Sequence, residues 1–334
     1  KVWLTVSSLW RPIAASDKVI DAELEVNWDL DCSSKPLLVE GTIVIFFSDK
    51  TIKPKLILTS LQHPRGYYRT NITVGRPTLP GGWDNKDGAT LPGPHCLKHH
   101  AALYKDGVFL TSSCLQIWPT WMRQLGRLPI GSLMIPGTHN SGCYKHGDLT
   151  RRDAFQKYLL TQDRDVWTQL VHGIRYLDIR VGYYPSIPND TTIGENISRF
   201  WINHDVIRIT PLSAIIKDVR NFLNVARGEV QTIEGLFKYL DDVIMGPKKT
   251  RNSQNPLWAV MAELTPYSLD IIFNLSGGLR QMADCVNRNL TYKFQEEWWK
   301  GTNIVATDFF LGNNLIDVSI QANIKKSNIA QWRL

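Results

Sequence analysis

Ile130-Gly-Ser-Leu-Met-Ile-Pro-Gly-Thr-His-Asn-Ser-Gly142 is the stretch of this chain that decides its fold. Its apolar residues predict a short buried strand over about 133–138, and Pro136-Gly137 keeps that strand short. His139 follows directly. A histidine at the end of a buried strand can take or give a proton near neutral pH. The stretch therefore predicts a strand of a buried sheet that presents a proton-transfer group.

Two later strands also carry polar side chains near their ends. Residues 174–181 form an apolar run in which Asp178 and Arg180 are two positions apart, so the pleat places both side chains on one face. Residues 201–206 predict a third strand, and His204 lies near its end. Histidine, aspartate and arginine at the carboxyl ends of successive strands are typical of an active site. We therefore expect these side chains to share one site with the histidine of the first strand.

Residues 123–334 alternate short apolar strands with amphipathic helices, which predicts an α/β domain with a parallel sheet. Thr210 is the expected N-cap of a helix that begins at Pro211; a second helix starts near Thr232, and a third covers about 279–290. We interpret the apolar stripes of these helices as core. The predicted strands cover about 133–138, 174–181, 201–206, 228–230, 258–264 and 303–308.

Residues 1–122 predict an all-β domain. Ala22-Glu-Leu-Glu-Val-Asn-Trp28 alternates apolar with polar residues, Gly41–Phe47 follows as a second strand and Gly107–Thr111 as a late one. Strands separated by Gly- and Pro-rich turns favour an accessory β-sandwich. The run His95-Cys-Leu-Lys-His-His100 has no second ligand pair at zinc-finger spacing, so we expect a loop there and not a metal site.

Composition favours an exported protein. The chain has 334 residues, 43% of them hydrophobic, with a formal net charge of +7 and a pI near 9.1 that suits anionic surfaces such as lipid headgroups. No Lys/Arg run is longer than Lys248-Lys249, and we expect no nucleic-acid partner. We also expect no transmembrane segment, and any signal peptide to have been removed before Lys1. Sequons that favour a secreted, extracellular glycoprotein occur at Asn71, Asn189, Asn196, Asn274 and Asn289.

The five cysteines allow at most two disulfides with one thiol left over. Cys32, Cys96 and Cys114 lie in the N-terminal part, so we expect two of them to pair there. Cys143 and Cys285 are candidates for a second bridge, and the connectivity stays open at this point.

Four motifs resemble the X-box domain of phosphatidylinositol-specific phospholipase C, in the small form found in bacterial enzymes and in animal proteins that contain this domain. They occur in the order of that family, and the resemblance covers roughly Leu125 to Asn323. The N-terminal part resembles that of secreted arthropod members. The motifs are Pro136-Gly-Thr-His-Asn-Ser-Gly142, Gly173-Ile-Arg-Tyr-Leu-Asp-Ile-Arg180, Asn203-His-Asp205 and Asn303-Ile-Val-Ala-Thr-Asp-Phe-Phe310.

The resemblance implies a distorted TIM-type barrel and a phosphoric diester hydrolase of lipid metabolism. It implies that His139 is the general base that takes the inositol 2-hydroxyl proton, and that His204 is the general acid that protonates the departing diacylglycerol oxygen. Arg180 would stabilise the pentavalent phosphorane. Asp178 would orient a proton carrier or a substrate hydroxyl, and Asp308 would hold the first histidine in its working tautomer. The implied product is an inositol cyclic phosphate.

The implied substrate is phosphatidylinositol or a glycosylphosphatidylinositol (GPI) anchor at a membrane surface. The large signalling phospholipases of this kind have calcium ligands where this chain has Arg180, so the resemblance implies a metal-independent enzyme without a cofactor. Asn140 and Glu263 are the expected substrate contacts. For Asn140, we favour a structural hydrogen-bonding role over that of a remnant calcium ligand.

The family pattern breaks at Val230-Gln231. Two βα units, roughly 60 to 80 residues, are missing there relative to a complete barrel of about 250 residues. The resemblance therefore implies an incomplete barrel with an open edge. The leading hypothesis is a phospholipase C, and the alternative is a catalytically impaired isoform that acts as a lipid- or protein-binding module. A more distant alternative is a magnesium-dependent phosphodiesterase barrel, such as a glycerophosphodiesterase or a sphingomyelinase-like toxin, built on acidic ligands.

Overall fold

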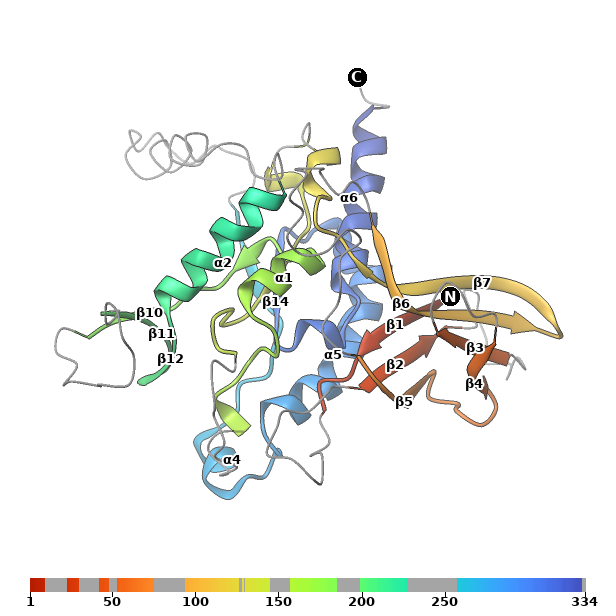
Figure 1. The fold of residues 1–334 in the computed structure, drawn as a ribbon, viewed down its shortest axis with the longest axis horizontal. Helices are drawn as coiled ribbons and strands as arrows, with labels where there is room; N and C mark the ends of the chain where they lie inside the picture. Colours follow the sequence, from red (N-terminus) through yellow and green to blue (C-terminus); the bar gives the residue numbers. More distant parts are fainter. Residues whose placement is uncertain are drawn as a thin grey trace.

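The part of the chain that the structure describes forms four sheets, one parallel and three antiparallel (Figure 1). The protein is therefore a mixed α/β molecule. The structure is a computed structural model. It describes residues 1–9, 23–29, 42–47, 53–74, 94–125, 128, 130–144, 157–184, 199–226 and 257–331.

The N-terminal strands form two antiparallel sheets, with the orders β1-β2-β5 and β4-β3-β6-β7. Side chains from both sheets meet in one buried apolar cluster, which includes Leu4, Leu24, Leu103 and Ile117. In β2 the apolar residues Leu24 and Val26 alternate with polar ones and enter this cluster, whereas every residue of β1 is buried. The strands are β1 (Val2–Val6), β2 (Glu23–Trp28), β3 (Thr42–Phe47), β4 (Pro54–Thr59), β5 (Tyr67–Thr73), β6 (His95–Lys105) and β7 (Val108–Ile117).

The strands predicted at Ala22–Trp28, Gly41–Phe47 and Gly107–Thr111 are confirmed as β2, β3 and the start of β7. The loop predicted for His95–His100 is wrong, because this segment is the first half of β6. Its inward side chain Leu97 is buried in the N-terminal core, which supports a strand where the polar residues had indicated a loop.

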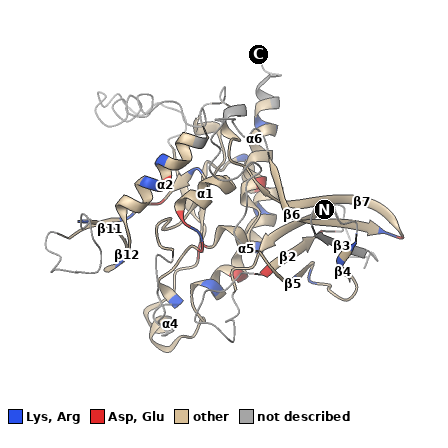
Figure 2. Cartoon of the chain, viewed as in Figure 1, with Lys and Arg blue, Asp and Glu red and all other residues tan. Residues whose placement is uncertain are grey.

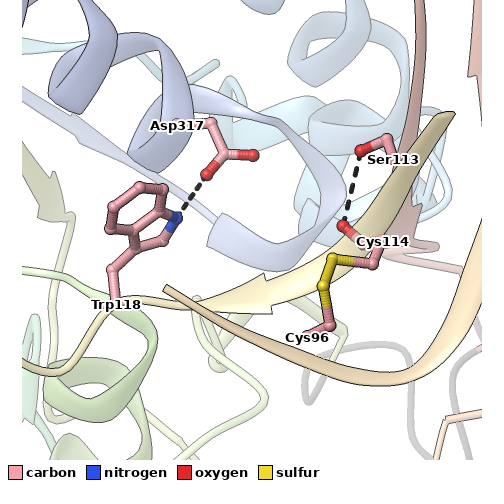
Figure 3. Close-up of a disulfide and its surroundings, with 5 residues drawn as sticks. All are labelled: Cys96, Ser113, Cys114, Trp118 and Asp317. Carbon is pink, nitrogen blue, oxygen red and sulfur yellow. Dashed lines mark hydrogen bonds between the residues drawn. A yellow bond between two sulfur atoms is a disulfide. The ribbon is translucent and has the colours of Figure 1, made fainter. Parts of the chain in front are cut away.

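A disulfide joins Cys96 to Cys114 across β6 and β7, with the Cα atoms 5.5 Å apart (Figure 3). The prediction that two N-terminal cysteines pair is thereby confirmed; Cys32 lies outside the described residues. A second bridge between Cys143 and Cys285 is wrong. Both are free thiols, the first buried and the second exposed on α5, so their side chains face different environments.

The parallel sheet has the order β13-β14-β8-β9. β14, the last strand of the chain, pairs in parallel with β8, the first strand of this sheet. Met134 and Val305 pack with apolar side chains of α5 and α6 in one buried cluster. The described strands do not close into a barrel. The elements are β8 (Ile135–Thr138), α1 (Val166–His172), β9 (Tyr176–Leu177), β13 (Ala259–Met261), α4 (Ser268–Phe273), α5 (Leu279–Glu296), β14 (Ile304–Thr307) and α6 (Leu315–Gln331).

The strand predicted at 174–181 is split between two sheets. Its first part is β9 in the parallel sheet, and its end is β10 (Val181–Tyr183), which pairs antiparallel with β11 (Phe200–His204). β11 then turns into β12 (Ile207–Pro211), and α2 (Leu212–Val225) follows. The strand predicted at 201–206 therefore ends at His204 and does not belong to the parallel sheet. The turn that ends it contains Asp205 with φ +54°, a conformation that aspartate tolerates better than most residues.

The helix predicted after Thr210 is confirmed as α2, but the N-cap is Pro211, and Thr210 lies in β12. The helix predicted at about 279–290 is confirmed as α5. The strand predicted at 228–230, the helix predicted from Thr232 and the junction at 230/231 lie outside the described residues.

No helix of the described part is long and apolar enough to cross a bilayer. Of the five sequon asparagines, Asn71 and Asn289 are exposed and Asn274 is half-buried. Asn189 and Asn196 lie outside the described residues.

Candidate active site

His139 and Asp308 are brought together by the register of two parallel strands. Thr138 of β8 is opposite Thr307 of β14, so the residues that follow each strand lie next to one another. Nδ1 of His139 is 2.7 Å from Oδ1 of Asp308, and both side chains are buried. Since a carboxylate accepts, Nδ1 carries the proton and Nε2 is left as the basic nitrogen.

The side chain of Gln162 hydrogen-bonds to the ends of both strands. Its Nε2 donates to the carbonyl of His139 (2.9 Å) and to the carbonyl of Thr307 (2.8 Å). The backbone N–H of His139 also donates to the Thr307 carbonyl (3.1 Å). Gln162 is fully buried. No periodicity or spacing singles this glutamine out, so it was missed in the sequence.

His139 lies between two carboxylates. Burial lowers its pKa, but the hydrogen bond and the charge of Asp308 and the charge of Glu263 outweigh burial and raise it. Burial raises the pKa of Asp308, and the nearby charges of His139, His204 and Arg180 offset this only in part. We take the proton of the pair to lie on the imidazole, because the hydrogen bond to the carboxylate stabilises it there.

Glu263 lies two residues after β13 and approaches the other side of the histidine. Its Oε1 is 3.9 Å from Nε2 of His139. Burial raises the pKa of Glu263, and its Oε2 is buried with no hydrogen-bond partner among the described residues. This oxygen therefore has hydrogen-bonding capacity that the described residues do not use.

Asp178 and Arg180 lie on the same side of the chain, as their spacing predicts. Nη2 of Arg180 is 2.9 Å from Oδ2 of Asp178, and the same oxygen accepts from the backbone N–H of Asn140 (3.0 Å). The Arg180 side chain is 46% exposed, so its guanidinium borders solvent while its charge acts on His139 and Asp308. A bound anion could therefore reach it beside the histidine.

His204 ends β11 and is oriented by a backbone carbonyl. Its Nδ1 lies 2.7 Å from the carbonyl of Leu159, and because a carbonyl can only accept, this nitrogen carries a proton. Nε2 is then left as the second nitrogen of the ring, and it can donate when it carries a proton. The charge of His204 acts on Asp308, which places this imidazole in the same electrostatic neighbourhood as His139.

Asn140 differs from its expected role. Its backbone N–H holds Asp178, but both polar atoms of its side chain are buried without a hydrogen-bond partner in the described part of the chain. Its φ of +43° is in the left-handed region. The structural hydrogen bond expected of its side chain is therefore wrong, and the main chain supplies the structural contact. A buried amide whose hydrogen-bonding groups are unsatisfied in the described residues is unusual in a folded protein and is a feature of binding sites.

The donor atoms that could hold a metal ion lie elsewhere. Within the described residues, the only group of three or more histidine, cysteine or acidic ligand atoms within 4.8 Å of one another is Cys96, His100 and Cys114. Its two sulfur atoms are bonded to each other, so they are not available as thiolate ligands. The magnesium-dependent alternative requires a cluster of acidic ligands. Among the described residues, no group of three or more ligand atoms of this kind includes His139.

No protein-family model matches this chain. The site around His139 combines a histidine oriented by an aspartate, a second histidine oriented by a carbonyl and an arginine that borders solvent. These groups can remove a proton, deliver a proton and stabilise an anion.

Proposed function

We propose that this protein is a phospholipase C of the phosphatidylinositol-specific X-box type, which cleaves phosphatidylinositol or GPI lipids without a metal ion. The observation that carries the proposal is the 2.7 Å contact between His139 Nδ1 and Asp308, with Arg180 and His204 acting on the same carboxylate. In this proposal His139 is the oriented base, His204 the acid and Arg180 the cation that the transfer of a phosphodiester needs.

The proposed reaction assigns one proton transfer to each histidine. Nε2 of His139 takes the proton of the inositol 2-hydroxyl, whose oxygen attacks phosphorus. The bond from phosphorus to the diacylglycerol oxygen breaks, and His204 gives that oxygen its proton. The products are diacylglycerol and inositol cyclic phosphate, and water can open the ring when the two histidines exchange roles. Arg180 neutralises the phosphorane, and Asn140 and Glu263 are proposed to bind inositol hydroxyls.

The sheet order supports an incomplete TIM-type barrel for residues 123–334. In a closed barrel the last strand pairs with the first, and β14 pairs in parallel with β8 in this way. The two N-terminal sheets share one buried cluster, which supports a β-sandwich accessory domain over residues 1–122. The Cys96–Cys114 disulfide supports the proposal that the protein is secreted and extracellular, and glycosylation at the sequons belongs to the same proposal.

Exposed apolar side chains support a lipid partner, because they follow the site residues along the chain. Val206, two residues after His204, is 79% exposed, and Tyr267, four residues after Glu263, is 81% exposed. Exposed apolar side chains mark an interaction surface where they gather on one face, as the i, i+3, i+4 spacing of Leu269, Ile272 and Phe273 on α4 indicates. We call the following residues the apolar rim: Val181, Tyr183, Val206, Leu264, Tyr267, Leu269, Ile272, Phe273 and Leu275.

A fluorogenic inositol phosphodiester assayed in EDTA tests the proposal. We expect turnover by the wild-type chain and its loss in His139→Ala. No turnover, or equal turnover by the variant, would refute it. Flotation with phosphatidylinositol vesicles distinguishes the enzyme from the alternative of a catalytically impaired lipid-binding module. Such a module would float with the vesicles and leave the lipid intact.

A further inference from the structure

A ring of four charges, with both of its carboxylates buried, joins the N-terminal strands to α5. Arg69 on β5 contacts Glu25 on β2 (2.7 Å) and Asp284 on α5 (2.5 Å). Arg288, one turn along α5, contacts the same Asp284 (2.9 Å) and the same Glu25 (3.2 Å). Each charge of this ring has two partners of opposite sign. We call these four residues the charge ring.

The charge ring is a strong constraint because its carboxylates are removed from water. Glu25 is fully buried and Asp284 nearly so. Leaving such a carboxylate unpaired costs several kcal/mol, so the ring holds α5 against β2 and β5. Figure 1 shows the N-terminal strands on one side of α5 and β14 on the other, and Figure 2 shows charged segments where the strands meet α5.

The same helix holds the turn that carries Asp308. Asn287 lies between Asp284 and Arg288 in the sequence, and its Nδ2 donates to the carbonyls of Asp308 (3.1 Å) and Phe309 (3.4 Å). Its Oδ1 accepts from Nδ2 of Asn313 (3.1 Å). Asn287 is buried and makes these contacts from the inner face of α5.

The turn after β14 requires such support. Phe309 has φ +45°, a left-handed conformation that is unfavourable for a bulky side chain. The guanidinium of Arg280, also on α5, lies 4.4 Å from the centre of the Phe309 ring and donates to the carbonyl of Ser8, just after β1 (3.1 Å). A Cβ added at Gly312 would lie 2.9 Å from Nδ2 of Asn287, so helix and turn pack closely. The N-terminal part thus contacts α5 at two places, at Arg280 near the start of the helix and at the charge ring further along it.

We propose that the N-terminal sheets position the His139–Asp308 pair through α5, with the charge ring as the joint and Asn287 as the positioning residue. A shift of α5 would move the Asp308 backbone and lengthen a hydrogen bond whose strength depends steeply on its geometry. The catalytic consequence rests on the proposed function, but the geometry of the pair can be measured without it.

The test is the NMR titration of the His139 imidazole in the full chain. We expect the raised pKa of His139 to fall by about half a unit or more in Arg69→Gln and in Asn287→Ala. Turnover should fall about tenfold to a hundredfold, with KM changed less than kcat. Glu296→Gln is the matched control, because its pair with Lys1 (2.9 Å) also joins the N-terminal part to α5 but is exposed, and it should leave the titration unchanged.

Folded Arg69→Gln and Asn287→Ala variants with the wild-type His139 titration would overturn the proposal. If Arg69→Gln does not fold, Arg69→Lys decides, because it keeps the positive charge between Glu25 and Asp284 but loses the planar fork that contacts both. If the wild-type chain hydrolyses no inositol phosphodiester, the proposed function fails, while the titration still decides whether the N-terminal sheets position the pair.

Discussion

His139 is a residue whose two ring nitrogens face two different carboxylates. Asp308 accepts from Nδ1 at 2.7 Å, and Glu263 lies 3.9 Å from Nε2. The first contact fixes the tautomer, and the second favours the protonated ring. A general base must be neutral before it can act, so these two carboxylates have opposite effects on the proposed reaction.

Replacing Asp308 with asparagine removes the acceptor that keeps the Nδ1 proton in place. Turnover of an inositol phosphodiester should fall about 10² to 10⁴-fold in Asp308→Asn, with KM changed little. Asp205→Asn is the control, because it removes an exposed carboxylate beside His204 at a position where asparagine tolerates the same left-handed backbone. Equal losses in both variants would contradict the role of Asp308.

Glu263→Gln should shift the pH dependence of turnover. The pKa of His139 is raised, so the neutral base is lost, and turnover falls, as the pH drops through that raised value. Removing the negative charge of Glu263 lowers the pKa of His139, and we expect the acid limb of kcat/KM to move down by roughly half a pH unit. An acid limb that stays in place or moves to higher pH would show that Glu263 does not act on the base.

At the scale of elements, the sequence predicts the strands that have a simple apolar pattern. β8 and β14 are short apolar runs followed by His139 and Asp308, and both were predicted at nearly their observed bounds. α5 was predicted from its apolar stripe. The split between β9 and β10 was missed, because one continuous run crosses two sheets and pairing partners leave no periodic signal.

α6 was missed for a different physical reason. Leu315, Val318 and Ile320 are buried, and so are the polar Ser319 and Asn323. A helix that buries polar residues among apolar ones shows no clean stripe. Asn323 both accepts from and donates to the backbone of Met134, so its burial supports β8 by hydrogen bonds that only the fold reveals.

The apolar rim yields a prediction about membrane binding. α4 presents Ile272 and Phe273 to solvent. Replacing either with serine should weaken binding to phosphatidylinositol vesicles about tenfold to a hundredfold, because transfer of one large apolar side chain contributes roughly 1.5–3 kcal/mol. Leu110→Ser is the matched control, since Leu110 is also exposed but is the third residue of β7, next to the β6–β7 turn. Figure 1 shows the β6–β7 hairpin and α4 on different sides of the view. Vesicle sedimentation measures the change, and equal weakening by the control would rule out a specific role for α4.

At the scale of the whole molecule, the end of the N-terminal part is attached to the last helix. Nε1 of Trp118, which follows β7, donates to Oδ1 of Asp317 in the first turn of α6 at 2.6 Å (Figure 3). Burial raises the pKa of Asp317 to about 6, and the hydrogen bonds from Trp118 and Asn314 lower it only in part. The folded protein therefore binds a proton here more tightly than the unfolded chain does.

This difference makes the stability depend on pH. The contribution of Asp317 is fully present below its unfolded pKa of about 4 and is lost as the pH rises through about 6. Asp317→Asn keeps the acceptor for Trp118 but does not ionise, so its free energy of unfolding should exceed that of the wild type by about 2 kcal/mol more at pH 7 than at pH 4. Urea unfolding at both pH values measures this, and a difference that does not change with pH would contradict it.

The most direct test of the central claim is a ³¹P NMR time course with phosphatidylinositol vesicles in EDTA. Two histidines that transfer the phosphodiester to the neighbouring hydroxyl must release inositol cyclic phosphate before any phosphomonoester. We expect the cyclic phosphodiester signal to rise first with the wild-type chain and to be absent with His139→Ala. A monoester formed without the cyclic product, turnover that requires added magnesium, or no turnover at all would contradict the proposed mechanism.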